Sequence, residues 1–206
     1  MADDYTWRHV VHSGQDAADV PASFTNLGFP FMNNEGQVAF TAQTDHLFAA
    51  SGIWRTLPGD PFTLDLVVAE TGPVPGGPFT AQFGDFGGFS FYHAILNDDG
   101  NIGFSAEISG FAEGDTGIFS FIDGVTSDVA LPGDPAPGAG AGSTYTSISN
   151  LAGFTEDDKA IFAASFEGPG VNASNDSALF SHNGGNVTVF AREGSAAPGL
   201  AGTTYG

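Results

Sequence analysis

Five polar residues stand beside a glycine turn that the chain uses four times. They comprise three carboxylates, a histidine and an arginine: His12, Glu70, Asp134, Arg192 and Glu193. Carboxylate oxygens are ligands that Ca²⁺ prefers, and a bound Ca²⁺ can polarise the carbonyl group of a substrate. If the four turns open onto one channel, we expect these side chains to form a polar ring at its mouth.

Two further loops carry oxygen ligands ahead of predicted strands. Glu113 and Asp115 lie in the segment EGDTG, and Asn175 and Asp176 lie in NASNDS. Both loops are candidates for calcium sites, and the alternative is that they are solvated loops without a ligand. The segment NDDGN at 97–101 lacks the spaced ligands and the terminal glutamate of a calcium loop, so we interpret it as a hairpin turn.

No catalytic motif accompanies these residues. The sequence contains no nucleophile elbow, phosphate-binding loop, dinucleotide fingerprint or zinc motif. Its five histidines do not pair at the i, i+2 spacing that places two ligands on one face of a strand. A serine triad is defined by geometry and not by residue order, so the sequence leaves open whether the protein is an enzyme.

The elements that would position these residues recur along the chain. Three segments align without gaps: FMNNEGQVAFTA (31–42), ILNDDGNIGFSA (95–106) and GFTEDDKAIFAA (153–164). They place Phe40, Phe104 and Phe162 in one column, 64 and 58 residues apart. About a dozen residues further on, a second aromatic column follows at steps of 65 and 61: Trp54, Phe119 and Phe180. Such regular spacing indicates a structural repeat.

A glycine column opens each unit of the repeat. Its members are separated by 58, 61 and 61 residues: Gly14, Gly72, Gly133 and Gly194. The stretch LPGDPAPGAGAG at 131–142 has the composition of a linker, but it is one copy of this recurring turn. We therefore expect no domain boundary there.

Each unit contains about four strands. TLDLVVAE (63–70) is rich in β-branched and apolar residues, and the central segments alternate apolar with small or polar residues, as half-buried strands do. Asparagine and glycine before the central strand predict a tight turn, in which Asp158 must replace glycine at positive φ in the third copy. We assign residues 1–206 to one repeat domain, with units near 5–62, 63–124 and 125–186 and a partial unit at 187–206.

These features predict an all-β fold. Four-stranded units of this length are typical of β-propeller blades, and another repeat architecture such as a β-solenoid is the alternative. The first strand recurs four times and the other strands three times, which is too few for a closed ring. We therefore expect a fragment of a longer propeller, or a homo-oligomer in which residues 187–206 complete a blade begun by Tyr5–Val11 of another copy.

The repeat resembles a known group of proteins. The elements N-x-x-G-x-V-A-F, as in MNNEGQVAF (32–40), and A-R-E-G-x-x-A-P-G, as in FAREGSAAPG (190–199), are similar to those of exported bacterial tandem-repeat proteins of unknown function. The resemblance covers essentially the whole chain, and residues 155–162 depart from the pattern. It implies an extracellular or cell-surface location.

The charge of the chain limits its partners. Twenty-four acidic and four basic residues give a formal net charge of −20, which repels nucleic acid and anionic lipid. No apolar run reaches the ~20 residues that a membrane helix needs, so we expect no membrane insertion. The chain has no cysteine, and its first residues lack the basic and apolar regions of a signal peptide.

These observations favour an exported β-propeller module that acts in binding or as a scaffold. Its ligand would be a small molecule or a glycan. The alternative is a calcium-dependent hydrolase, similar to lactonases, with Ca²⁺ as its cofactor and its site at the propeller channel.

Overall fold

The computed structural model describes residues 9–86, 94–111 and 116–206. Within these ranges the chain forms strands, turns and loops without a helix, and the strands make three antiparallel sheets. The all-β prediction is therefore confirmed. The described residues also include no helix that could cross a lipid bilayer.

The first and third sheets are meanders in which neighbouring strands of the sequence pair, and in the second sheet two short strands share the position of the first strand. The first sheet contains β1 (Phe24–Met32), β2 (Val38–Thr44), β3 (Ser51–Leu57) and β4 (Asp60–Ala69). The second contains β5 (Gln82–Phe83), β6 (Ala94–Leu96), β7 (Ile102–Ser109), β8 (Thr116–Ile122) and β9 (Val125–Ala130), with β5 and β6 both paired to β7. The third contains β10 (Thr144–Phe154), β11 (Ala160–Glu167), β12 (Ser177–Asn183) and β13 (Asn186–Arg192).

The two aromatic columns of the sequence form one cross-strand pair in each sheet. Residues that lie opposite each other on neighbouring strands share a face, and large rings placed there pack together. The three pairs have ring centroids 6.4, 5.4 and 5.6 Å apart: Phe40–Trp54, Phe104–Phe119 and Phe162–Phe180. All six side chains are buried, so the same aromatic pair fills the core of every unit.

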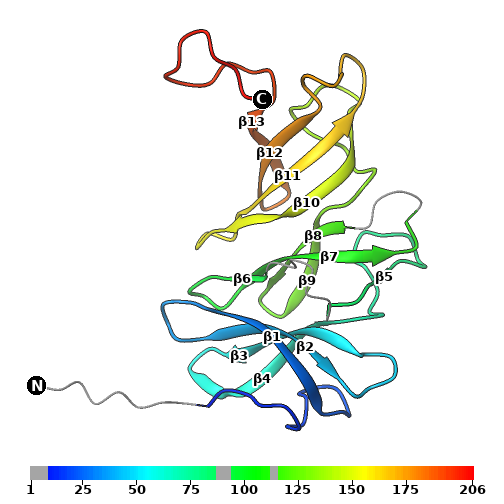
Figure 1. The fold of residues 1–206 in the computed structure, drawn as a ribbon, viewed down its shortest axis with the longest axis vertical. Helices are drawn as coiled ribbons and strands as arrows, with labels where there is room; N and C mark the ends of the chain where they lie inside the picture. Colours follow the sequence, from blue (N-terminus) through cyan, green and yellow to red (C-terminus); the bar gives the residue numbers. More distant parts are fainter. Residues whose placement is uncertain (1–8, 87–93, 112–115) are drawn as a thin grey trace, which may run out of the picture.

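The sheets lie face to face along the longest axis of the molecule (Figure 1). Ala39 and Ile53 of the first sheet share a core with Phe104 and Phe119 of the second. Ile118 and Ala130, on the opposite side of the second sheet, share a core with the aromatic pair of the third sheet. The aromatic pair of the first sheet packs instead against residues 10–22, which precede that sheet. Each sheet is thus covered by the part of the chain before it.

The sheets are out of phase with the units expected from the sequence. The strand expected to open a unit at residue 63 is β4, which closes the first sheet, and β9 and β13 close the second and third sheets in the same way. A repeat period fixes the length of a unit but does not show where a sheet begins. The sheets therefore span residues 24–69, 82–130 and 144–192.

A loop with the same backbone hydrogen bonds occurs four times: before each of the three sheets and once more after the third. The first residue of the loop donates its backbone N–H to the carbonyl of an aromatic residue at the end of the loop, over distances of 2.7 to 2.9 Å. The four pairs are Gly14 to Phe24, Thr71 to Phe83, Gly133 to Tyr145 and Gly194 to Tyr205. These four residues have φ between 63° and 87°. Glycine tolerates that region without strain, whereas Thr71 adopts it at a cost. The glycine alignment predicted from the sequence is therefore shifted by one residue in the second copy, where Thr71 and not Gly72 is equivalent to Gly14.

A second set of turns connects the sheets through side chains. The turns at 33–37, 97–101 and 155–159 follow β1, β6 and β10 and lie above one another along one side of the stack (Figure 1). Gly36, Gly100 and Asp158 have φ of 78°, 85° and 58°, so Asp158 does replace glycine as the sequence predicted. We call these three turns the turn ladder.

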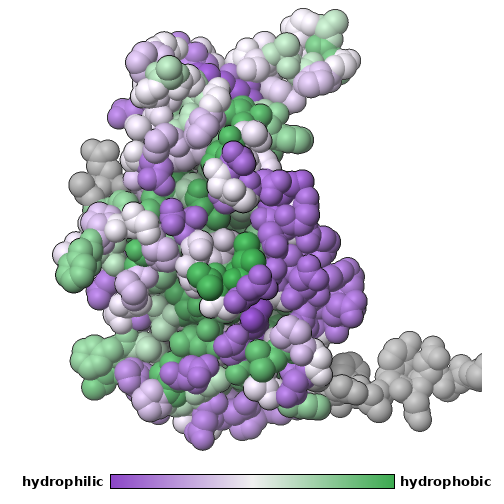
Figure 2. All heavy atoms as spheres, turned by 180° about the vertical axis from the view of Figure 1, so that it is seen from behind, coloured by the Kyte–Doolittle hydropathy of each residue, from purple (hydrophilic) through white to green (hydrophobic). Residues whose placement is uncertain are grey.

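Asparagine amides hold the turn ladder together. Asn33 Nδ2 donates to the carbonyl of Asn97 at 2.7 Å, and Asn97 Nδ2 donates to Asp158 Oδ1 at 2.9 Å. Asn33 and Asn97 are both buried. The hydrophilic column in Figure 2 runs along the side where these turns lie. A buried amide whose hydrogen-bond partner lies in the next sheet fixes the position of one sheet relative to the other, because a buried amide without a partner costs free energy.

Candidate functional site

The residues of the expected polar ring lie on separate loops of the stack. His12 belongs to the loop before the first sheet, Glu70 follows β4, Asp134 follows β9, and Arg192 and Glu193 lie at the end of β13. Among the described residues no hydrogen bond or ion pair joins any two of these five. Only Arg192 and Glu193 are brought together, because they are neighbours in the sequence.

Two of these residues have the same structural role. Glu70 Oε2 accepts a hydrogen bond from the hydroxyl of Ser51 at 3.0 Å, and Glu193 Oε2 accepts one from Ser177 at 3.1 Å. Each bond joins the start of a sheet's third strand to the residue after its fourth strand. The two carboxylates therefore connect the third strand of a sheet to the end of its fourth strand.

His12 and Asp134 are also engaged locally. His12 is exposed, its Nδ1 lies 2.8 Å from the carbonyl oxygen of Ser13, and its ring stacks on that of His9 at 5.0 Å. Asp134 Oδ2 accepts a hydrogen bond from the backbone N–H of Leu131 at 2.9 Å. Burial raises the pKa of Asp134, the hydrogen bond from Leu131 opposes that rise, and the charge of Asp128 adds to it.

Arg192 connects three segments around the third sheet. Its Nε donates to the carbonyl of Asn175 at 3.0 Å, and its Nη1 donates to the carbonyl of Ala139 at 2.6 Å. The guanidinium also lies 4.9 Å from the centroid of the Phe166 ring. Charge-assisted hydrogen bonds and a cation–π contact of this kind hold loops firmly in place. Arg192 thereby fixes the loop at 168–176, between β11 and β12.

The predicted calcium residues of this loop differ in their availability. Asn175 Oδ1 accepts the N–H of Asn172 at 2.8 Å, and Asn175 Nδ2 donates to the carbonyl of Gly170 at 3.3 Å. The amide of Asn175 therefore shapes its own loop. Asp176 lines an open groove, while Glu113 and Asp115, the other predicted calcium residues, lie outside the described residues.

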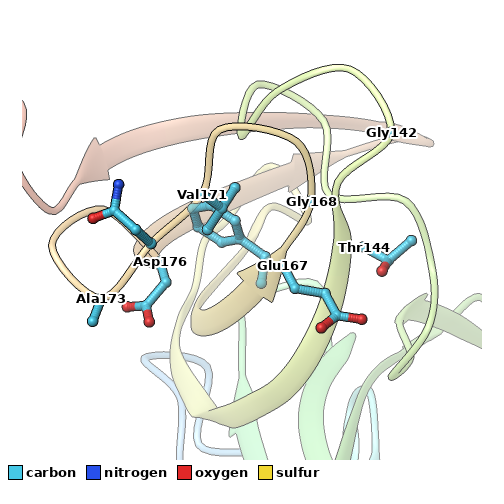
Figure 3. A pocket seen from close by; sticks show the side chains of 9 residues that line it. Gly142, Thr144, Glu167, Gly168, Val171, Ala173 and Asp176 are labelled. Carbon is cyan, nitrogen blue, oxygen red and sulfur yellow. The ribbon is translucent and has the colours of Figure 1, made fainter.

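Two open grooves flank the 168–176 loop. The first, of about 420 Å³, is bordered by Thr144, Glu167, Val171 and Asp176 (Figure 3). In this view Val171 lies between the side chains of Asp176 and Glu167, whose carboxylates point to opposite sides. The second groove, of about 440 Å³, is bordered by Ser174, Asn175, Arg192, Glu193 and Ser195. Four of the nine predicted site residues thus lie together: Asn175 and Asp176 belong to this loop, and Arg192 and Glu193 lie beside it.

Sequence reasoning missed two buried hydroxyl groups on either side of Thr144, a residue that lines the first groove. Ser143 and Tyr145 are each 3% exposed, and neither hydroxyl has a hydrogen-bond partner within the described structure. A Cβ on Gly168 would lie 2.6 Å from Ser143 Oγ, so only glycine fits at that point of the first groove. Burial, and then the charge of Asp134, raises the pKa of Tyr145 far above its ordinary value. Ser143 ends the glycine-rich loop and Tyr145 is the second residue of β10, and no sequence pattern indicated that their hydroxyls are buried.

The grooves are lined mainly by polar groups, and the described residues around them form no catalytic constellation. Within residues 9–86, 94–111 and 116–206, no three side chains of His, Cys, Asp or Glu come together to hold a metal ion. His182, the histidine of the third sheet, is half-buried, and burial lowers its pKa, which the charge of Asp128 opposes. Hydroxyl, amide and backbone groups around the second groove are hydrogen-bonding partners of neutral polar ligands.

Comparison with known proteins gives a family. A search of the curated proteins found no match. The model of a family of unknown function, DUF7453, matches twice, over residues 1–155 and 51–206. The two matches overlap and together include the whole chain, as expected for a sequence with an internal repeat. The chain therefore belongs to the DUF7453 family of unknown function.

Proposed function

We propose that this chain is a module of a β-propeller, exported or displayed at the cell surface, that acts in binding or as a scaffold. Three features support the proposal. Each sheet is antiparallel with four or five strands, adjacent sheets pack face to face, and the connecting loop recurs between them. Blades of a propeller have this construction, in which repetition buries one face of every sheet against its neighbour.

The observation that carries the binding role is the pair of grooves around the 168–176 loop. Arg192 donates to the carbonyl of Asn175 in this loop and to that of Ala139 in an earlier loop, and both residues line the second groove, so its walls are fixed before a ligand arrives. Preformed walls reduce the conformational entropy lost on binding. The second groove is lined by hydroxyl, amide and carboxylate groups, which suits a glycan or another small hydroxylated molecule better than an apolar one.

A substitution that fills the second groove tests this role. Ser195 is exposed at the rim, so Ser195→Trp is expected to block the groove without disturbing the core. Gln15→Trp is the matched control, because Gln15 accepts the N–H of Phe24 just as Ser195 accepts that of Tyr205. Ligand-observed NMR with a panel of neutral oligosaccharides should show binding by the native chain and by Gln15→Trp, and none by Ser195→Trp. Binding that Ser195→Trp leaves unchanged would place the ligand elsewhere and refute the assignment.

The export proposal follows from the resemblance of the repeats and fits the composition. A formal net charge of −20 keeps a repeat protein soluble through self-repulsion. Fractionation of the producing cells tests the location: the proposal requires the protein in the medium or at the surface, accessible to added protease. Recovery only from the protease-protected interior of intact cells would rule it out.

A further inference from the structure

The third sheet has an uncovered face. Ala163, Leu179 and Ala191 lie opposite one another on β11, β12 and β13, and all three are partly exposed. They point away from the core that the third sheet shares with the second, because the neighbouring row, Phe162 and Phe180, belongs to that core. We call the surface around Ala163, Leu179 and Ala191 the open face.

The same face is covered in the other two sheets. Ile53 is equivalent to Leu179 in the first sheet and Ile118 in the second, since each is the third-strand partner in the same cross-strand row. Ile53 and Ile118 are both 0% exposed. The aromatic pair of the following sheet covers each of them. Leu179 remains partly exposed because the described chain has no sheet beyond the third.

The loop that would lead to a covering sheet is already formed. Residues 194–205 make the same bridge as the three earlier loops, between Ala196 and Thr204, and Gly194 and Tyr205 make the same backbone hydrogen bonds. Thr204–Tyr205 also repeats the residues Thr144–Tyr145 that open the third sheet. In Figure 1 this loop extends beyond β13 at the end of the stack.

Tyr205 lacks the ring contacts of its equivalents. Phe24, Phe83 and Tyr145 are at most 3% exposed, and each lies 4.9 to 5.1 Å from the third-strand ring of its own sheet. Tyr205 is 38% exposed and borders a groove of about 220 Å³ together with Ala163, Leu179 and Ala191. The apolar part of this groove is continuous with the exposed ring, and serines, Arg192 and Glu193 line the rest of it.

We infer that the open face is a docking surface for a further four-stranded repeat of the same family, joined to the chain through Tyr205. Such a repeat presents an aromatic pair, like Phe162–Phe180, that would pack between Tyr205 and Leu179. A second copy of this chain fits less well. Its own loop at 14–24 occupies the position that residues 194–205 take here, and each copy carries a net charge of −20.

An extended chain tests this inference on the whole protein. A copy of residues 146–206 is joined directly after Tyr205, so that Thr204–Tyr205 replaces Thr144–Tyr145 as the start of a fourth sheet. The chain has no cysteine, so Leu179→Cys places a single thiol on the open face. Its rate of labelling by a maleimide is measured in the native-length and the extended chain. Glu35→Cys, in an exposed turn of the first sheet, is the control for general reactivity.

Docking of the fourth repeat should slow labelling of Leu179→Cys by at least about tenfold and leave Glu35→Cys unchanged. Leu179→Glu in the extended chain should release the appended repeat, detected as rapid proteolysis of that segment alone. An appended repeat that stays unfolded, or that folds and leaves Leu179→Cys as reactive as before, overturns the inference. Dimers of the native-length chain that protect Leu179→Cys would identify a second copy as the occupant and overturn it too. Each outcome is independent of ligand binding in the groove beside Ser195.

Discussion

Asn97 is the central residue of the turn ladder, and its truncation gives the sharpest test of how the sheets are held together. The side chain is 1% exposed. Its Oδ1 accepts the N–H of Asn101 at 2.8 Å, and its Nδ2 donates to Asp158 Oδ1 at 2.9 Å and to the carbonyl of Thr155 at 3.3 Å. Asn97→Ala removes all three bonds and leaves the buried N–H of Asn101 without this acceptor.

The expected cost follows from these contacts. A neutral hydrogen bond contributes about 1 kcal/mol and one to a carboxylate about 1.5–3 kcal/mol, so Asn97→Ala should lower the free energy of unfolding by about 3.5–5 kcal/mol. That loss is a large fraction of the ~5–15 kcal/mol typical of a folded domain. Asn34→Ala is the matched control, because Asn34 is exposed and its amide makes one bond, to Asp98 at 2.9 Å. It should cost less than about 1 kcal/mol.

Urea unfolding followed by far-UV circular dichroism measures both variants. The explanation fails if Asn97→Ala costs no more than Asn34→Ala. Asn97→Asp adds an internal check: it keeps the acceptor for Asn101 but places a second carboxylate against Asp158. It should be destabilised at neutral pH and recover part of its stability when acid protonates one of the two groups.

Two further predictions concern Asp134 and calcium. Burial raises the pKa of Asp134 in the folded protein above 3.8, so its folded state binds more protons and stability falls as pH rises through that window. Asp134→Asn keeps an acceptor for the N–H of Leu131 and should have a higher melting temperature than the native chain at neutral pH. The difference in melting temperature should shrink toward pH 3.8. A melting temperature below that of the native chain would show that the charged hydrogen bond outweighs burial. For calcium, binding at Asp176 predicts that added Ca²⁺ raises the melting temperature of the native chain and not of Asp176→Asn. If EGTA changes neither melting temperature nor ester hydrolysis, both calcium binding and the calcium-dependent hydrolase are refuted.

Local patterns in the sequence predicted the strands, and they did so for a physical reason. Alternation along β11 buries Phe162, Ala164 and Phe166 and leaves Ala163 and Ser165 partly exposed, which is a property of the strand itself. The positive φ of Asp158 was likewise predictable, because the turn at 155–159 is closed by residues within it. Features that depend on four or five consecutive residues can be read without knowledge of the fold.

The site could not be predicted in this way. Glu70, Asp134 and Glu193 were chosen because they adjoin the recurring turn, and the sequence does not show that Glu70 and Glu193 each bond a serine on the neighbouring strand. The alignment on glycine also hid the equivalence of Thr71 and Gly14, since the backbone conformation recurs where the residue type does not. The groove around the 168–176 loop depends on Arg192 reaching Ala139, 53 residues away.

The hydrogen bonds of the turn ladder run in one direction along the stack, and this direction indicates how a further sheet would be joined to it. In both steps the earlier turn donates and the later turn accepts: Asn33 to Asn97, and then Asn97 to Asp158. The backbone follows the same rule, with the N–H of Asn34 bonded to Asp98 and that of Asp98 bonded to Glu156. By this rule the third turn directs the N–H of Glu156 toward the position of a fourth turn, on the side of the open face. A fourth repeat should therefore carry an acidic or amide residue at the position of Asp98 and Glu156, and the appended copy of residues 146–206 does so because it repeats Glu156 itself.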